Sequence, residues 1–168
     1  MRILTLLCSL FFATPLFAHE YTAGDITIKH PMSPATTGKT SAGYMMISNT
    51  SAVADRLIAA EADFPRVEMH NTIVTDGVAK MQKQTAIEIP AGGQAQFAPG
   101  GLHIMFMGLS QHLMDGDSIP ATLVFENAGR VDITFHVKPR AYIADHMDMD
   151  HSSHDHSGEN KHSCHHDH

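Results

Sequence analysis

The chain has 168 residues, with 11 Lys and Arg against 18 Asp and Glu, 43% hydrophobic residues, 14 His, 11 Met and two Cys. This length fits one ordinary domain once the terminal segments are set aside, so a multidomain enzyme is excluded. The net charge of -7 offers no basic surface for a polyphosphate, and nucleic acid is therefore not an expected partner.

Residues 1–18 are typical of an export signal. A basic residue after the initiator Met, an apolar run over 3–12 and a final Ala suit cleavage before His19. The run is too short to span a bilayer, which needs about 20 apolar residues. Cys8 does not fit a lipidation site, because it lies inside this run and follows a bulky Leu. We therefore expect export to the periplasm, with no insertion of the mature chain into the membrane.

Residues 19–140 are expected to form one all-β domain. Apolar and polar residues alternate along 131–137 with the period of two that is typical of a half-buried strand. Other short runs are separated by turn signals and cover residues 26–30, 44–48, 56–60, 66–74, 78–82, 86–89, 102–108 and 121–126. Many short strands at this spacing favour an antiparallel sandwich or barrel, and no helix longer than a turn or two is expected.

A two-residue hairpin is predicted at Asp76-Gly77. The residue numbers of paired positions then sum to 153, so that His70 opposes Lys83. In this register His70 and Met81 share one face of the hairpin as diagonal neighbours, roughly 7–8 Å apart at the backbone. Met69 points the opposite way, into the core or a neighbouring sheet.

The next strand, over residues 102–107, places His103, Met105 and Met107 on one face. Met is a common core filler and a single His is usually structural, so none of these residues is evidence by itself. Two His and at least two Met on two strand segments of an exported chain are a stronger signal. Together they favour a site for a soft metal ion.

Residues 141–168 differ sharply in composition, with eight His, two Met and one Cys from residue 145 onward. A segment with so few aliphatic residues is expected to be disordered. The His residues are interspersed with Asp and Ser, which does not fit a purification tag. Their imidazole and carboxylate groups suit Cu(II), Zn(II) or Ni(II), so we expect a metal-binding tail of lower specificity. The candidate tail ligands are His146, Met147, Met149, His151, His154, His156, His162, Cys164, His165, His166 and His168.

The spacing His70-x10-Met81-x21-His103-x-Met105 resembles the copper-ligand pattern of the PCu(A)C family of periplasmic copper chaperones. The similarity covers about residues 22–138 and extends to the flanking motifs His30-Pro31, Gly43-Tyr44-Met45, Ala54-Asp55-Arg56-Leu57 and Gly100–Met105. The resemblance implies a cupredoxin-like, immunoglobulin-like β-sandwich that binds Cu(I) near its surface through these four residues. Met32, Pro34 and Asn71 depart from the family pattern near the site.

The donor set agrees with that implication. Thioethers are soft donors that favour Cu(I), and they are a poor match for Zn(II). Residues 19–140 contain no Cys, which excludes a blue-copper centre. We therefore expect a copper chaperone and not an enzyme, with Cu(I) in the core site and Cu(II) in the tail. The resemblance implies delivery to a copper-accepting subunit of cytochrome c oxidase, or to a thiol-bearing assembly protein.

Two alternatives stay open. The tail also suits a periplasmic copper buffer or resistance protein, which would store the ion and not deliver it. Cleavage before His19 would expose an amine and an imidazole that together chelate Cu(II), as in copper oxygenases with a histidine brace. Such a brace needs a second His, for which His30 and His112 are the weak candidates.

Overall fold

The computed structural model of the protein describes residues 20–147, so the predicted export signal and residues 148–168 of the predicted tail lie outside it. The described part contains eleven strands and one helix. The strands are β1 (Glu20–Ala23), β2 (Ile26–Pro34), β3 (Thr40–Asn49), β4 (Asp55–Ala62), β5 (Arg66–Thr75), β6 (Val78–Gln84), β7 (Ile87–Ile89), β8 (Gln94–Phe97), β9 (Leu102–Met107), β10 (Ser118–Phe125) and β11 (Arg130–Lys138). The helix is α1 (Arg140–Met147).

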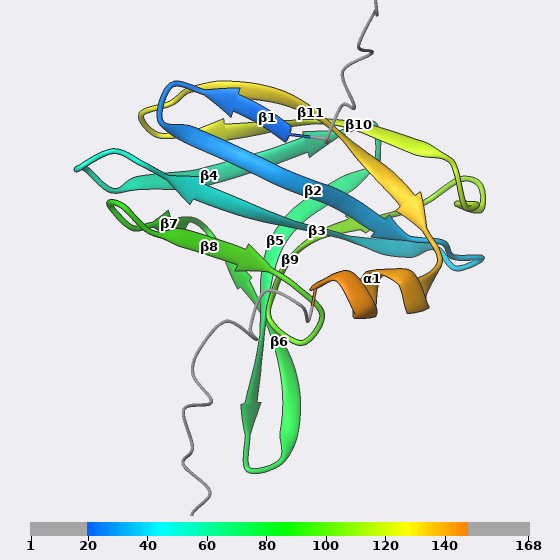
Figure 1. Ribbon diagram of the computed structural model, residues 1–168. Coiled ribbons are helices and arrows are strands. Elements are labelled where there is room, and N and C mark those ends of the chain that lie inside the picture. Colours follow the sequence, from blue (N-terminus) through cyan, green and yellow to red (C-terminus); the bar gives the residue numbers. More distant parts are fainter. Residues whose placement is uncertain (1–19, 148–168) are drawn as a thin grey trace, which may run out of the picture.

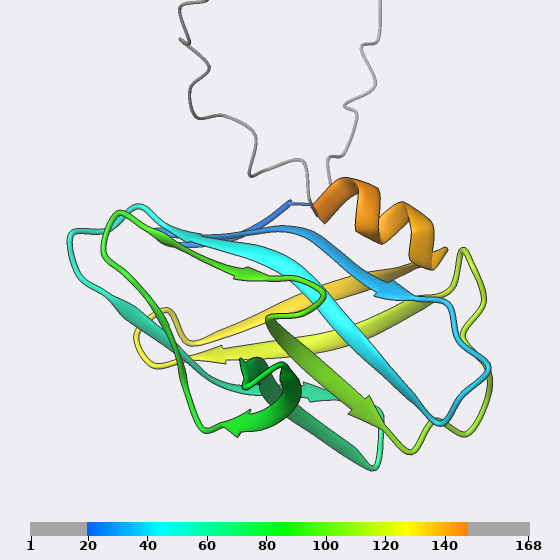
Figure 2. The same cartoon turned by 90° about the horizontal axis from the view of Figure 1, so that it is seen from below.

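The strands form one continuous hydrogen-bonded path that curls into two layers, as Figures 1 and 2 show. Their order is β6-β5-β9-β8-β3-β2-β11-β10-β4-β7, with β1 added to β2 and a second pairing between β9 and β3. All pairings are antiparallel except those of β11 with β2 and of β8 with β9. The predicted all-β antiparallel sandwich is therefore confirmed.

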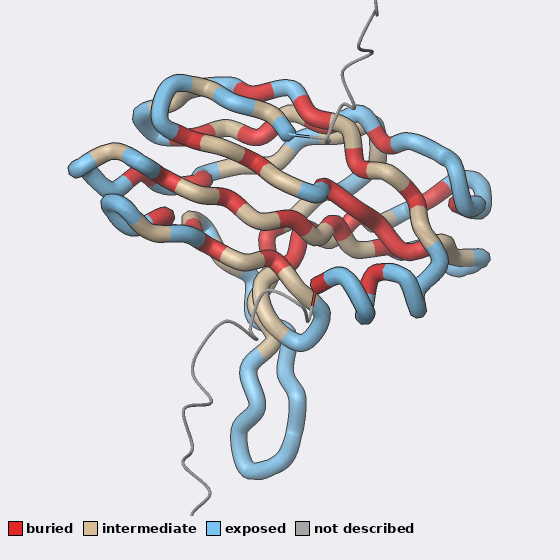
Figure 3. The backbone as a smooth tube through the Cα atoms, in the orientation of Figure 1, coloured by how far each residue is buried: buried red, intermediate tan, exposed pale blue. Residues whose placement is uncertain are grey.

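Buried residues alternate with more exposed residues along the strands (Figure 3), with the same period of two as the apolar and polar residues in the sequence. Phe106 of β9 and Phe135 of β11 meet in the core with their rings edge to face, 5.5 Å apart. Gly43 of β3 lies directly beside them, and a Cβ at that position would fall 2.8 Å from the Phe135 ring. This strand therefore needs a glycine where the two rings pack against it.

Helix α1 contradicts the prediction that the folded domain ends at residue 140 and that disorder begins at 141. Ile143 and Met147 are 1% and 6% exposed, and they pack with Met32 against Tyr44. Two apolar residues four positions apart lie on one face of a helix. So short an apolar stripe was missed in the sequence analysis because the composition of the whole segment is polar. Within residues 20–147, no helix is both long and apolar enough to cross a membrane.

Two short strands were also missed by the sequence prediction. β1 and β8 have four residues each, and each contains polar side chains that mask the strand pattern. β8 nevertheless contributes Phe97, which is fully buried in the core. Strand β8 pairs with β3 and begins the parallel contact with β9, so it supports the strand that carries His103.

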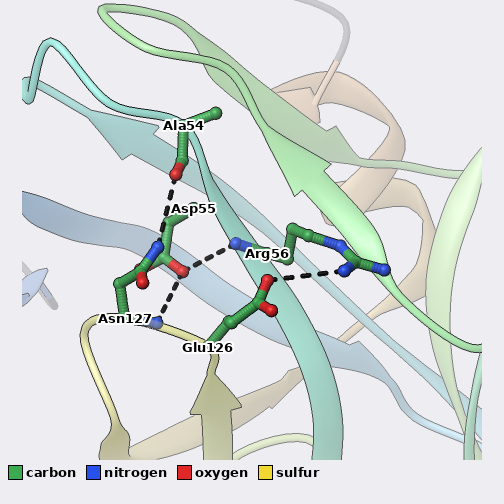
Figure 4. A network of polar contacts seen from close by, with 5 residues as sticks. All are labelled: Ala54, Asp55, Arg56, Glu126 and Asn127. Atoms are coloured by element: carbon green, nitrogen blue, oxygen red, sulfur yellow. Dashed lines mark hydrogen bonds and ion pairs between the residues drawn. The ribbon is translucent and has the colours of Figure 1, made fainter.

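Asp55, at the start of β4, holds the turn between β10 and β11 through hydrogen bonds (Figure 4). Its carboxylate is 4% exposed and accepts hydrogen bonds from the backbone N–H groups of Arg56, Asn127 and Ala128 at 2.7–2.9 Å. Burial alone would raise the pKa of Asp55, but these hydrogen bonds outweigh it and lower the pKa below its usual range. The carboxylate thus holds the β10–β11 turn against the start of β4.

The Asp55→Asn variant is expected to be less stable than the wild type by about 1–3 kcal/mol, because an amide presents one acceptor oxygen where the carboxylate presents two. At pH values above the usual Asp pKa, the lowered pKa of Asp55 stabilises the wild type. This stabilisation is lost as the pH falls through the lowered pKa. The variant should therefore show a shallower acid loss of melting temperature, measured by circular dichroism across acidic pH. Asp63→Asn, at an exposed position, should behave like the wild type; equal acid sensitivity of the Asp55 variant and the wild type would contradict the assignment.

Candidate metal centre

Three neighbouring strands bring the four predicted ligands onto one face. In the pairing of β5 with β9, His70 lies directly opposite His103. In the pairing of β5 with β6, Met81 lies opposite Thr72. Because side chains alternate along a strand, His70, Met81, His103 and Met105 all point to the same side of the sheet.

The hairpin between β5 and β6 has the predicted register at all of its seven pairs, and His70 opposes Lys83. Its turn is formed by Asp76 and Gly77, with φ angles of 53° and 76°. Positive φ at both central residues is the geometry of the tight turn that Asp-Gly favours. Met69, on the opposite face of β5, is 5% exposed and lies in the core, as predicted.

His103 is held as a neutral imidazole. It is 4% exposed, and its Nδ1 donates a hydrogen bond to the carbonyl of Gly101 at 3.0 Å. A carbonyl only accepts, so the proton is on Nδ1 and the lone pair is on Nε2, which is buried and makes no hydrogen bond within the described residues. Burial lowers the pKa of His103, the Gly101 hydrogen bond raises it less, and the nearby His70 lowers it further.

His70 has the opposite tautomer, which Glu68 enforces. The Nε2–H group of His70 donates to one Glu68 oxygen at 2.9 Å, and the other oxygen accepts from Nζ of Lys83 at 2.8 Å. The Lys83 hydrogen bond and, second, the His70 hydrogen bond lower the pKa of Glu68 to about 2. In the neutral ring Nδ1 of His70 has the lone pair, and this atom too is buried without a hydrogen bond in the described part of the chain.

Glu68 is the functional residue that the sequence analysis missed. A carboxylate that orients a ligating imidazole from behind is a recurring feature of metal sites. The signal was available, since Glu68 is two positions before His70 and so shares its face.

The two imidazoles therefore present unused lone pairs on one face of the sheet. Their ring centres are 5.8 Å apart. A buried polar atom without a hydrogen bond costs about 1–3 kcal/mol, and two such atoms side by side are unusual in a folded protein. A cation that accepts both lone pairs would remove this cost.

The two thioethers complete the donor set. Met81, His103 and Met105 line one cavity of about 200 Å³. Met105 is half-buried, whereas Met81 is 62% exposed. Two soft sulfurs beside two neutral imidazoles suit a soft ion of low charge.

The far wall of this cavity is formed by β3 and the start of α1. Tyr44 and Arg140 both line it. Burial raises the pKa of Tyr44, and the nearby charge of Arg140 partly opposes that rise. The first residue of helix α1, Arg140, is therefore part of the surroundings of the site, at the position where the sequence analysis expected the domain to end.

Other sequence candidates lie away from these four residues or outside the described residues. Met107 lies further along β9, opposite Arg66 and Thr40. In α1, Nδ1 of His146 donates to the carbonyl of Tyr142 at 2.9 Å and the two rings stack, while Met147 is buried. These two residues thus belong to a helix of the folded domain and not to a disordered tail, and their role as metal ligands stays a prediction.

The remaining tail candidates, Met149, His151, His154, His156, His162, Cys164, His165, His166 and His168, lie outside the described residues, as does His19. His30 and His112, the other candidates for a histidine brace, are both exposed. Between residues 20 and 147, no three His, Cys, Asp or Glu side chains gather to hold a metal ion.

The sequence is similar to proteins described as lipoproteins. The family described as "Putative lipoprotein LpqE-like" matches residues 26–137. A protein of Leifsonia xyli subsp. xyli, described as "Putative lipoprotein Lxx21020", is 37% identical over 73 residues. That match covers 43% of this chain and 44% of the relative, so the chain spans less than half the length of this curated relative.

The fold is similar to that of several solved domains. The copper-bound PCuAC domain from PmoF2 is 33% identical, with a TM-score of 0.61, over 72% of this chain and 98% of that domain. The apo PCuAC domain from PmoF1 is 27% identical, with a TM-score of 0.62, over 72% and 99%. The apo-DR1885 protein of Deinococcus radiodurans is 23% identical, with a TM-score of 0.52, over 83% and 95%, and it supports the fold alone. The predicted cupredoxin-like sandwich is thereby confirmed.

The Glu68→Ala variant is expected to release His70 from its single tautomer. Without the carboxylate acceptor, the proton of His70 should distribute over both ring nitrogens. The ¹⁵N chemical shifts of that ring should then move toward an average, measured by NMR on the metal-free protein at alkaline pH. His103, which is held by Gly101, should keep its shifts, and Glu88→Ala at an exposed site should change neither ring. Unchanged His70 shifts in Glu68→Ala would show that Glu68 does not set the tautomer.

Proposed function

The chain belongs to the LpqE-like family, and on that premise we propose that it is a copper chaperone whose cargo is Cu(I). One observation carries the proposal: two buried imidazole nitrogens that make no hydrogen bond within residues 20–147 share a face with two Met residues. The similarity of the domain to the copper-bound PCuAC domain from PmoF2, over 98% of that domain, supports copper as the ion.

In this proposal the ligands are Nδ1 of His70, Nε2 of His103 and the sulfurs of Met81 and Met105. Thioethers favour Cu(I) over Cu(II) and Zn(II). They also resist the disulfide formation that would inactivate thiolates in an oxidising compartment. Four neutral donors bind the ion less strongly than a set that includes thiolates, so the ion can pass to a stronger acceptor.

The acceptor in this proposal is the copper-accepting subunit of cytochrome c oxidase or a thiol-bearing assembly protein. The sequence resemblance to periplasmic copper chaperones supports both choices, and a thiolate is a stronger Cu(I) donor than a thioether. Export by residues 1–18 would place the transfer in the periplasm. The folded domain extends to residue 147, and the predicted tail follows it in the sequence. Passing an ion between ligand sets requires no catalytic group, so the protein acts as a carrier and not as an enzyme.

Residues 148–168 are proposed as a second site that holds Cu(II) close to the domain. They contain seven His, one Cys and four Asp. Tethering such a site to the domain raises the local concentration of copper at the core site. Copper bound there as Cu(II) needs one electron from an external reductant before the core site accepts it.

A copper buffer is the second candidate function, and the His content of the tail favours it. The two functions differ in what happens when an acceptor is present. A chaperone loses its Cu(I) to a soluble, metal-free copper domain of the oxidase, whereas a buffer retains it. Gel filtration of the mixture followed by metal analysis of each protein separates the two.

Loss of one imidazole or of the inner thioether is expected to remove stoichiometric Cu(I) binding. His70→Ala leaves three donors and exposes Glu68, and Met105→Ala removes the half-buried sulfur. Competition with a chromogenic Cu(I) chelator measures the effect, and Met114→Ala, at an exposed Met outside the site, is the control. Retained one-to-one binding in the double variant Met81→Ala, Met105→Ala would refute the site as drawn.

A chain that ends at Met147 is expected to keep its one Cu(I) and to lose most Cu(II) binding, as measured by titration of each ion. A chain that ends at Arg140 should in addition melt at lower temperature, because it lacks the buried side chains of Ile143 and Met147. Burial of one such side chain stabilises a protein by about 1.5–3 kcal/mol. Equal melting temperatures of the two forms would contradict the docking of α1, and full Cu(II) binding by either form would contradict the tail site.

A further inference from the structure

We infer that Met81 is the exchange ligand of the site, the one that gives way when copper enters or leaves. This inference rests on the proposed function and deepens it. It assigns the three other donors to a fixed half of the site. It also assigns the β5–β6 hairpin to the open side, where a donor of the acceptor protein replaces the Met81 sulfur.

Burial divides the four donors into two groups. His103 is 4% exposed, the His70 side chain is 16% exposed and Met105 is half-buried, whereas Met81 is 62% exposed. A ligand that leaves must lie where an incoming donor can reach the ion. Of the four, only Met81 lies largely in solvent.

Strand pairing divides the donors in the same way. β9, which carries His103 and Met105, is paired with β5 on one side and with β3 and β8 on the other. β6, which carries Met81, is the edge of the sheet and pairs with β5 alone among the described strands. Movement of Met81 therefore disturbs only the pairing of β6 with β5, whereas movement of the other donors disturbs strand pairings within the sandwich.

The hairpin also lies outside the body of the domain. Figures 1 and 3 show the β5–β6 end projecting away from the two layers, and every residue from 73 to 83 is exposed. A two-stranded ribbon with no layer packed on it is marginally stable and opens at low free-energy cost. By contrast, Met69 and Ile104, the paired core residues of β5 and β9 next to the two His, are fixed by packing.

The exchange itself is a ligand substitution at constant oxidation state. One bond from copper to the Met81 sulfur breaks, and one bond from copper to the incoming thiolate, thioether or imidazole forms. Copper stays Cu(I) throughout, so no electron donor is needed. His70, His103 and Met105 bind the ion while the ligand at the fourth position is exchanged.

The hairpin supplies a contact surface for the incoming donor. Val74 and Ala79 are paired with each other, two pairs nearer the tip than Thr72 and Met81, and therefore share the face of Met81. Val74 is 69% exposed, and exposed apolar side chains on a projecting ribbon are typical of a contact surface. Lys80, between Ala79 and Met81 in sequence, points to the opposite face.

Leucine substitutions test the division of the donors, because Leu keeps the size of Met and removes the sulfur. Met81→Leu should still bind one Cu(I), with affinity reduced on the order of tenfold, and should release it to a chelator faster than the wild type. Met105→Leu should lose on the order of a hundredfold or more in affinity. Met114→Leu, at an exposed Met outside the site, should match the wild type.

A matched pair of bulky substitutions tests the open side without touching a ligand. Ala79→Phe places a ring on the Met81 face and should slow Cu(I) transfer to a bulky chelator several-fold, with unchanged affinity, in stopped-flow absorbance. Lys80→Phe places the same ring on the other face and should leave the rate unchanged. Circular dichroism is used to check that both variants fold.

The outcomes separate the inference from the proposed function. If the wild type fails to bind one Cu(I), the proposed function falls. If the wild type binds one Cu(I), but Met81→Leu and Met105→Leu weaken binding equally or Ala79→Phe and Lys80→Phe transfer at equal rates, only the inference is overturned.

Discussion

The pairing of β5 with β9 is the constraint on which the site depends. It sets His70 opposite His103, and alternation along the two strands then places Met105 on the same face. A shift of one residue in this register would turn one strand's donors into the core and bring Met69 or Ile104 to the surface. Core packing therefore fixes the arrangement of the four proposed ligands, because the apolar core residues of these strands alternate with them.

The local parts of this arrangement were predictable and the non-local parts were not. Asp76-Gly77 defined the hairpin and its register, so the relation of His70 to Met81 followed from the sequence. The contact of His70 with His103 joins strands more than 30 residues apart, and no turn signal specifies it; the family resemblance supplied it. Helix α1 was missed because Ile143 and Met147 are buried only against a surface that includes Met32, which the sequence pattern does not reveal.

Glu68 shows how the protein prepares donors before any ion binds. Its charge, shared between His70 and Lys83, holds one imidazole with the lone pair turned inward, and the Gly101 carbonyl does the same for His103. In the proposed function, the free-energy cost of two buried nitrogens without hydrogen bonds in the described part of the chain favours binding of a cation, and the exposed Met81 allows its release. The proposal thus assigns binding and release of the ion to different strands of the same sheet.

Copper K-edge X-ray absorption on the form that ends at Met147, loaded with one equivalent of Cu(I), tests the central claim most directly. The account predicts a Cu(I) edge and a first shell of two nitrogen and two sulfur scatterers, and no sulfur scatterer around the residual copper that the double variant Met81→Ala, Met105→Ala takes up. A first shell of nitrogen and oxygen alone, or a sulfur contribution that survives in the double variant, would contradict it.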